Sequence, residues 1–199
     1  MIASKGLTFL SVIVLLALSI VFAPVVADPA DHYGYGLRVT ARIAFAFFML
    51  AYVARSWVQM FGSRRWLVRN RRYLGLAAAI AHTVHFVYIV LYFRQTGEVI
   101  EPITIIFGGL AYVLFWVMAA TSNNFSMRLL GRWWKRLHTF GMHYIWLIFF
   151  QSWVGGALEA PWYWGFVVVA IGGLGLRILA WFKHRAMAVA AGARTCISA

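Results

Sequence analysis

Four histidines lie inside long apolar stretches of this sequence, where an ionisable side chain is costly to place. His82 and His85 are three residues apart in one stretch, and His138 and His143 are five apart in another. Ionisable groups within a membrane-spanning segment usually face the interior of a helix bundle and mark function. The four histidines are therefore the first candidates for chemistry in this chain.

Neutral imidazoles on facing helices are well suited to hold a haem that has no covalent link to the protein. The apolar stretches contain no Cys, Asp or Glu that would complete a zinc site or join a proton relay. Cys196 is the only cysteine, and no C-x-x-C-H haem-attachment motif is present. The histidines predict one haem b. The alternative is that they hydrogen-bond neighbouring helices as structural residues.

Helical geometry limits how these histidines can pair. His82 and His85 are about 60° apart around a helix, so they can face one pocket but cannot bind opposite sides of one iron. His138 and His143 are about 140° apart, so only one of them is expected to face the other histidine-bearing helix. We therefore expect one ligand from each stretch.

Depth in the membrane bears on which histidines pair. His138 follows Arg136 by two residues and is expected near the membrane surface. His85 follows Arg72 by 13 residues, which is about 20 Å along a helix. His143 matches the depth of His85 better, unless the helix that carries His138 begins well before the apolar stretch.

Two arginines interrupt the start of another apolar stretch. Arg38 and Arg42 are one helical turn apart and are candidates for pairing with haem propionates. The alternative is that their side chains extend to lipid headgroups at the membrane surface.

Composition indicates the fold class that positions these residues. Of 199 residues, 63% are hydrophobic and 12% are charged, and the mean hydropathy is +0.79. Soluble domains are about 45–50% apolar and about 25% charged, so a soluble enzyme is excluded, and disordered chains are poorer still in apolar residues. The apolar runs are nearly continuous, whereas an outer-membrane barrel would alternate in polarity. The sequence predicts an all-α membrane protein.

A bilayer core requires about 20 apolar residues in a helix. Six membrane-spanning helices are predicted in a single domain that covers residues 1–199, with the bilayer as its main partner. They cover residues 7–26, 37–57, 73–93, 102–120, 137–154 and 162–182.

Charge distribution predicts how these helices cross the membrane. The formal net charge is +13, and most Lys and Arg residues lie in segments at one side of a six-span path, namely Lys5, 55–72, 128–136 and 183–194. All five acidic residues lie at the other side. The positive-inside rule places both termini in the cytoplasm of an inner (plasma) membrane protein. The charge is thus a topology signal rather than a sign of nucleic-acid binding, and a polybasic surface can also attract an acidic partner.

The first predicted helix has two interpretations. Lys5, the apolar run after it, and Val25 to Ala27 before Asp28 resemble a cleavable signal sequence. Residues 7–26 are also long enough to span a bilayer, and this length favours a retained helix.

The sequence resembles the ferric-reductase-like transmembrane family, and within it the MsrQ type of haem-binding membrane subunit. The resemblance covers about residues 36–154. It is carried by residues 36–38 (Gly-Leu-Arg), 71–76 (Arg-Arg-Tyr-Leu-Gly-Leu) with His85, 102–122, and 130–138 (Leu-Gly-Arg-Trp-Trp-Lys-Arg-Leu-His).

This resemblance implies b-type haem and electron transfer across the membrane. By position, His85 and His138 match iron ligands of the family, with His143 and His82 as local substitutes. Gln151 stands where the family often has a further histidine, so a second haem is not expected.

The resemblance also implies partners. No flavin or nicotinamide domain is evident in the chain, so electrons are expected from a cytoplasmic flavoprotein or a quinol, and any flavin or quinone is expected to belong to that partner. The basic loops are the expected docking face. The acceptor is expected to be a periplasmic reductase or ferric iron. A non-redox scaffold or small transporter with structural histidines is the alternative.

Overall fold

The computed structural model describes residues 7–18, 31–63 and 65–197, and side chains up to residue 187. This part of the chain is helical and contains no strand. After a short helix at Leu7–Leu18 come α2 (His32–Phe61), α3 (Arg65–Thr96), α4 (Pro102–Ala120), α5 (Asn124–Leu130), α6 (Arg132–Glu159), the 3₁₀ turn η2 (Pro161–Tyr163) and α7 (Trp164–Ile197).

Local sequence signals end and begin these helices. α2 ends at Gly62, whose positive φ of 65° lets its N–H donate to the carbonyl of Val58. α4 begins with Pro102. Proline has no backbone N–H, and this loses nothing at the start of a helix, where the N–H groups have no partner within the helix. The side chain of Asn123 accepts a hydrogen bond from the N–H of Ser126 and so caps α5. Gly131, with φ 50°, separates α5 from α6.

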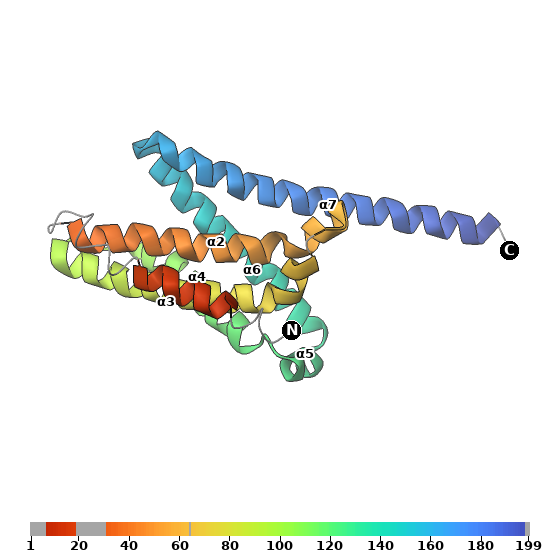
Figure 1. The fold of residues 1–199 in the computed structure, drawn as a ribbon, viewed down its shortest axis with the longest axis horizontal. Coiled ribbons are helices and arrows are strands. Elements are labelled where there is room, and N and C mark those ends of the chain that lie inside the picture. Colours follow the sequence, from red (N-terminus) through yellow and green to blue (C-terminus); the bar gives the residue numbers. More distant parts are fainter. Residues whose placement is uncertain (1–6, 19–30, 64, 198–199) are drawn as a thin grey trace.

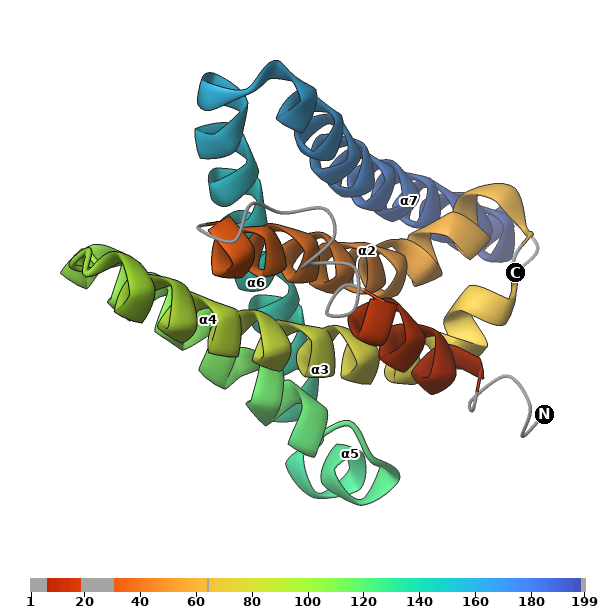
Figure 2. The same cartoon turned by 60° about the vertical axis from the view of Figure 1, so that its left-hand side comes forward.

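The helices form a bundle in which α2 occupies the centre (Figure 1). α3 packs along α2, and α4 lies between α3 and α6 (Figure 2). α7 packs against both α2 and α6. Small residues allow the closest approach, because a Cβ at Gly36 of α2 would collide with the ring of Tyr88 on α3.

Aromatic rings fill the centre of the bundle. Phe48 of α2 lies 5.6 Å from Tyr52, 6.0 Å from Phe115 of α4 and 5.5 Å from Phe149 of α6, measured between ring centroids. All four side chains are at most 7% exposed. This cluster holds three helices together at the level where the candidate site begins.

Four of the six predicted spans lie in helices that are long and apolar enough to cross a membrane. These helices are His32–Phe61, Arg65–Thr96, Pro102–Ala120 and Pro161–Met187. The span predicted at 137–154 lies within α6. This helix is long enough to cross a membrane, but it is less apolar than the other four because it contains two histidines, Gln151 and several Trp and Tyr side chains. The helical membrane fold is therefore confirmed.

The first predicted span is described only in part. Residues 7–18 form a helix, whereas the remainder of that span and the candidate cleavage position lie outside the described residues. The choice between a signal sequence and a retained helix therefore stays a prediction.

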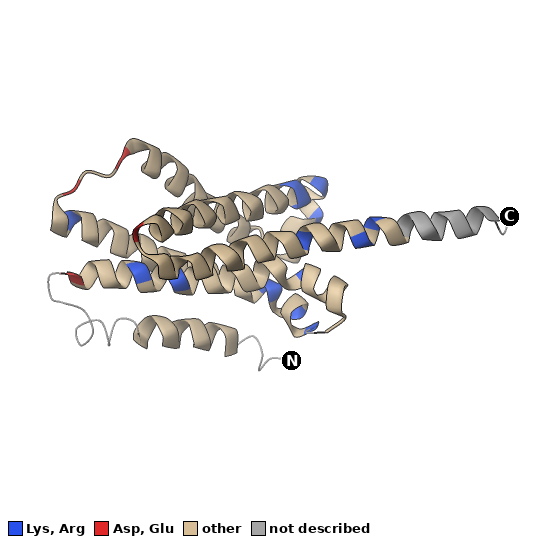
Figure 3. Cartoon of the chain, turned by 90° about the horizontal axis from the view of Figure 1, so that it is seen from above, with Lys and Arg blue, Asp and Glu red and all other residues tan. Residues whose placement is uncertain are grey.

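Charged residues are segregated along the bundle. Most Lys and Arg side chains lie at one end, and the described Asp and Glu side chains lie at the other (Figure 3). We call these the basic end and the acidic end. The acidic end also carries Arg38, Arg42 and Arg94, of which Arg38 forms an ion pair with Asp31.

Candidate functional site

A cavity of about 700 Å³ opens at the basic end of the bundle. Pockets for small molecules and cofactors usually measure about 300–1,000 Å³, so this cavity is of a suitable size. Its lining combines two kinds of wall. One wall is apolar and contains Phe48, Phe115, Met118 and Met142, and the other is rich in arginine and lysine.

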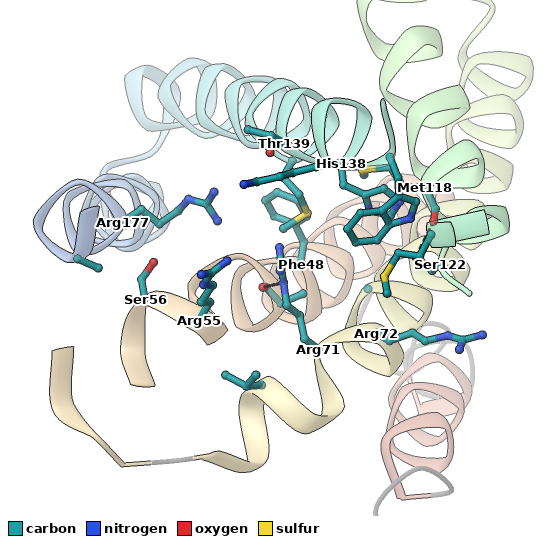
Figure 4. Close-up of a pocket in the computed structure, with 18 of the residues that line it drawn as sticks. Phe48, Arg55, Ser56, Arg71, Arg72, Met118, Ser122, His138, Thr139 and Arg177 are labelled. Atoms are coloured by element: carbon teal, nitrogen blue, oxygen red, sulfur yellow. Dashed lines mark hydrogen bonds between the residues drawn. The ribbon is translucent and has the colours of Figure 1, made fainter. Parts of the chain in front are cut away.

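His138 of α6 is one of the residues that line this cavity (Figure 4). Its ring stacks on Trp134, one helical turn earlier, with 4.1 Å between ring centroids. Its Nε2 lies 3.0 Å from the hydroxyl oxygen of Thr121, which follows α4. Trp134 also donates its indole N–H to the carbonyl of Thr121 at 2.8 Å. The turn between α4 and α6 thus fixes the position of the His138 ring.

The hydrogen bonds of Thr121 indicate which nitrogen of His138 is protonated. The Thr121 hydroxyl donates to the carbonyl of Val117 at 2.7 Å, so it accepts from the Nε2–H of His138. The other ring nitrogen then keeps a free lone pair. A neutral imidazole of this kind is the form that binds a metal.

Three arginines from three helices point into the cavity. They are Arg55 of α2, Arg71 of α3 and Arg177 of α7, whereas the neighbouring Arg72 points away from them (Figure 4). The Nε of Arg71 donates to the carbonyl of Ala51 at 3.1 Å. This part of the lining contains no carboxylate among the described residues.

His82 and His85 lie at a different level of the bundle and do not line the cavity. Their ring centroids are 5.5 Å apart on α3. The ring of His82 packs on Phe115 at 4.8 Å and faces Phe149 at 6.1 Å. Its Nδ1 is buried and has no hydrogen-bond partner.

The His85 ring turns toward α2. Its Nδ1 lies 3.1 Å from the carbonyl oxygen of Leu37 and 3.3 Å from the hydroxyl oxygen of Thr40. Because the carbonyl can only accept, the Nδ1–H of His85 donates to it. This is the geometry of a histidine that links two helices.

The fourth histidine, His143, also lies outside the cavity lining. Its Nδ1 is 2.7 Å from the carbonyl oxygen of Thr139 on its own helix. Its ring meets the edge of Tyr52 with centroids 5.8 Å apart. Of the four predicted histidines, only His138 is therefore placed in the cavity.

The structure does not bring His85 and His138 to one pocket. Gly75 of α3 lines the cavity together with His138, and His85 follows ten residues later, about 15 Å further along the helix. The contact of His82 with Phe149 also places the α3 histidines far from His138. Phe149 lies on α6, 11 residues beyond His138. The predicted pairing of these two histidines on one iron would require a different packing of α3 and α6.

The two arginines expected to bind propionates also lie away from the cavity. Arg38 is paired with Asp31, and the guanidinium of Arg42 lies 4.5 Å from the ring centroid of Trp162 and 5.9 Å from that of Tyr163. Both arginines belong to the acidic end. Arg38 is thus paired within the protein, whereas Arg42 contacts aromatic rings and its buried Nε has no hydrogen-bond partner among the described residues.

Sequence reasoning missed the arginines that line the cavity. From the sequence, Arg55 and Arg71 are interpreted as part of the topology signal, and Arg71 also belongs to the motif at residues 71–76 and to the expected docking face. Arg177 carried a clearer signal, because it is a single charge inside the last apolar stretch, and such charges usually face a bundle interior.

Fold and site together define a multi-pass helical membrane protein with a histidine-containing cavity at one end of its bundle. The chain is 33% identical over 132 residues to the protein-methionine-sulfoxide reductase heme-binding subunit MsrQ of Bordetella pertussis, over 61% of this chain and 63% of that protein. Subunits of the same name from Enterobacter sp. (strain 638) and Klebsiella pneumoniae are 28% and 29% identical, over 61% of this chain and 67% of each protein. The resemblance to the MsrQ type is confirmed, and the chain is a homologue of these haem-binding subunits.

These relatives extend beyond the matched region. The chain spans 63% of the length of the Bordetella proteins that it matches. No family model matches the chain. No solved structure matches it either.

Proposed function

We propose that this chain holds one b-type haem in the cavity at the basic end and passes electrons from a cytoplasmic donor to a periplasmic acceptor. The observation that carries the proposal is a cavity of about 700 Å³ that His138 lines opposite apolar side chains, in a homologue of haem-binding subunits. A porphyrin needs apolar walls, an axial imidazole and cations for its propionates, and the lining offers all three. Bound haem would supply one-electron redox chemistry.

In this proposal the chain's own residues bind and orient the group. His138 serves as an axial ligand, held by Trp134 and Thr121. Phe48 and Met118 exclude water from the inner wall. His85 stays a proposed second ligand, and its distance from the cavity makes it the weaker one. His82 is the alternative to His85 on α3, and His143 is the alternative to His138 on α6.

The orientation of the proposed pathway follows from the two ends of the bundle. The positive-inside rule places the basic end in the cytoplasm of an inner membrane, where a flavoprotein or a quinol serves as donor. The acidic end then faces the periplasm, where a reductase or ferric iron accepts the electrons. Since the cavity lies at the basic end, electrons would enter close to the haem.

Liposomes that enclose ferricyanide test the electron-transfer function. With haem-loaded protein in the bilayer and dithionite outside, we expect ferricyanide inside to be reduced at a rate that rises in proportion to the haem content. Neither reagent crosses a lipid bilayer, so the electrons must pass through the protein. Liposomes with His138→Ala protein are the control. A rate equal to that of protein-free liposomes would contradict the proposal.

A further inference from the structure

Arg55, Arg71 and Arg177 form a cluster of three cations on one side of the cavity (Figure 4). Each side chain comes from a different helix, so the folded bundle is what brings them together. Arg55 lies close enough to repel both Arg71 and Arg177, and these two also repel each other. The protein therefore assembles like charges here against their electrostatic repulsion.

The contacts of these arginines leave their charge uncompensated. Arg71 donates to the carbonyl of Ala51 at 3.1 Å, and Arg177 donates to the carbonyl of Tyr52 at 2.9 Å. Arg177 also lies 4.3 Å from the ring centroid of Tyr52. Backbone carbonyls and an aromatic face orient the two guanidinium groups, but neither supplies a negative charge.

No acidic side chain that the structure describes is available for the arginine cluster. Four of the chain's five Asp and Glu residues are described, and all four lie at the acidic end (Figure 3). Both Arg71 and Arg177 are half-buried, and a charge withdrawn from water is costly unless it is paired. A bound anionic molecule would supply the negative charge that the described residues lack.

We propose that the arginine cluster is a site for paired carboxylates and that the two haem propionates occupy it; this inference rests on the function proposed above. Two carboxylates balance most of the charge of three arginines, and guanidinium groups bind carboxylates through paired hydrogen bonds. Arg71 acts electrostatically on His138, so the iron ligand and the arginine cluster belong to one cavity. In this assignment the propionates are bound away from Arg38 and Arg42, which lie at the acidic end beside Asp31 and Trp162.

This assignment also orients the haem. Arg55, Arg71 and Arg177 would hold its propionates toward the basic end, and the wall that contains Phe48 and Phe115 would receive its apolar part. The edge nearest the cytoplasmic donor is then the one bound by arginine.

Haem dimethyl ester, whose propionates are esterified and uncharged, tests the assignment. Detergent-solubilised apoprotein is titrated with haem b and with the ester, using wild-type protein, Arg71→Gln, Arg177→Gln and the matched control Arg69→Gln. For haem b we expect Arg71→Gln and Arg177→Gln each to weaken binding about 10- to 100-fold, because each loses a charge-assisted hydrogen bond. Arg69→Gln should remain within about twofold of wild type, since Arg69 is exposed on the same helix and does not line the cavity.

The ester separates a propionate contact from general damage to the cavity. Wild-type protein should bind the ester more weakly than haem b, and this loss of affinity should be similar to the loss that each arginine substitution causes for haem b. The arginine variants should bind the ester with the same affinity as wild-type protein does. Equal losses for haem b and the ester in Arg71→Gln would overturn the inference. The wild-type comparison needs no substitution, so a variant that fails to fold leaves the test intact.

Two other outcomes would also overturn the inference. Wild-type protein that binds haem b and its ester equally well refutes the propionate site while leaving the proposed function standing. Purified protein whose phospholipid phosphorus falls in Arg71→Gln, with haem affinity unchanged, would assign the arginines to an anionic lipid headgroup instead. Wild-type protein that binds neither porphyrin refutes both this inference and the proposed function.

Discussion

Replacing His138 by alanine is expected to lower the haem content of the purified protein at least about tenfold. His138 is the one predicted histidine that lines the cavity, and a lost axial ligand removes both the iron bond and the ring that covers one porphyrin face. Alanine also frees Trp134 from its stacking partner without introducing a new polar group. Haem per chain, measured as the pyridine haemochrome, reports the loss.

The other histidines provide matched controls on the same helices. His143→Ala on α6 and His82→Ala on α3 should retain most of the haem, because neither side chain lines the cavity. His85→Ala should lower the haem content less than His138→Ala does, because His85 is the weaker proposed ligand, and it should also cost stability, since His85 donates to the carbonyl of Leu37. A loss of all haem in both His85→Ala and His138→Ala would instead establish these two as a pair. A loss in His143→Ala alone would contradict the ligand assigned here.

Reversing charge at the basic end is expected to slow electron entry about 10- to 100-fold at low salt. The exposed arginines of α5 and the first turns of α6 face the side where a soluble donor would dock. Complementary charge mainly raises the rate of encounter, so the variant R128E/R132E/R136E should repel an acidic donor. Reduced flavodoxin, an acidic flavoprotein, is the probe, and haem reduction is followed by stopped-flow spectroscopy.

Salt and position distinguish a docking effect from damage to the haem site. At about 0.5 M salt, screening should bring the rates of variant and wild type close together. Arg94→Glu at the acidic end should leave the rate within about twofold of wild type. Slowing that persists at high salt, or that equally affects reduction by dithionite, would contradict a docking role for these arginines.

The apolar stretches predicted the helices well but not where they begin. α3 starts at Arg65, eight residues before the apolar stretch at 73–93, and α6 starts at Arg132. Hydropathy detects only the part of a helix that needs lipid or protein around it, whereas backbone hydrogen bonding continues through basic residues whose charges reach water. The early start of α6 is what places His138 one turn after Trp134 and beside the turn that contains Thr121.

The candidate site was predictable in part. Histidines inside apolar stretches stand out because their residue type conflicts with their surroundings, so His138 could be identified from the sequence. The arginine cluster could not, because the direction of Arg55, Arg71 and Arg177 depends on how α2, α3 and α7 pack against one another. The pairing of His85 with His138 rested on resemblance, and periodicity along one helix carries no information about its level relative to another.

The difference spectrum between reduced and oxidised protein tests the central claim most directly. Wild-type protein, expressed with ample haem and purified in detergent, should show the sharp α band of b-type haem at a stoichiometry of one haem per chain. Colourless wild-type protein that also fails to bind added haem would contradict the account, because the histidines and the cavity would then serve another purpose.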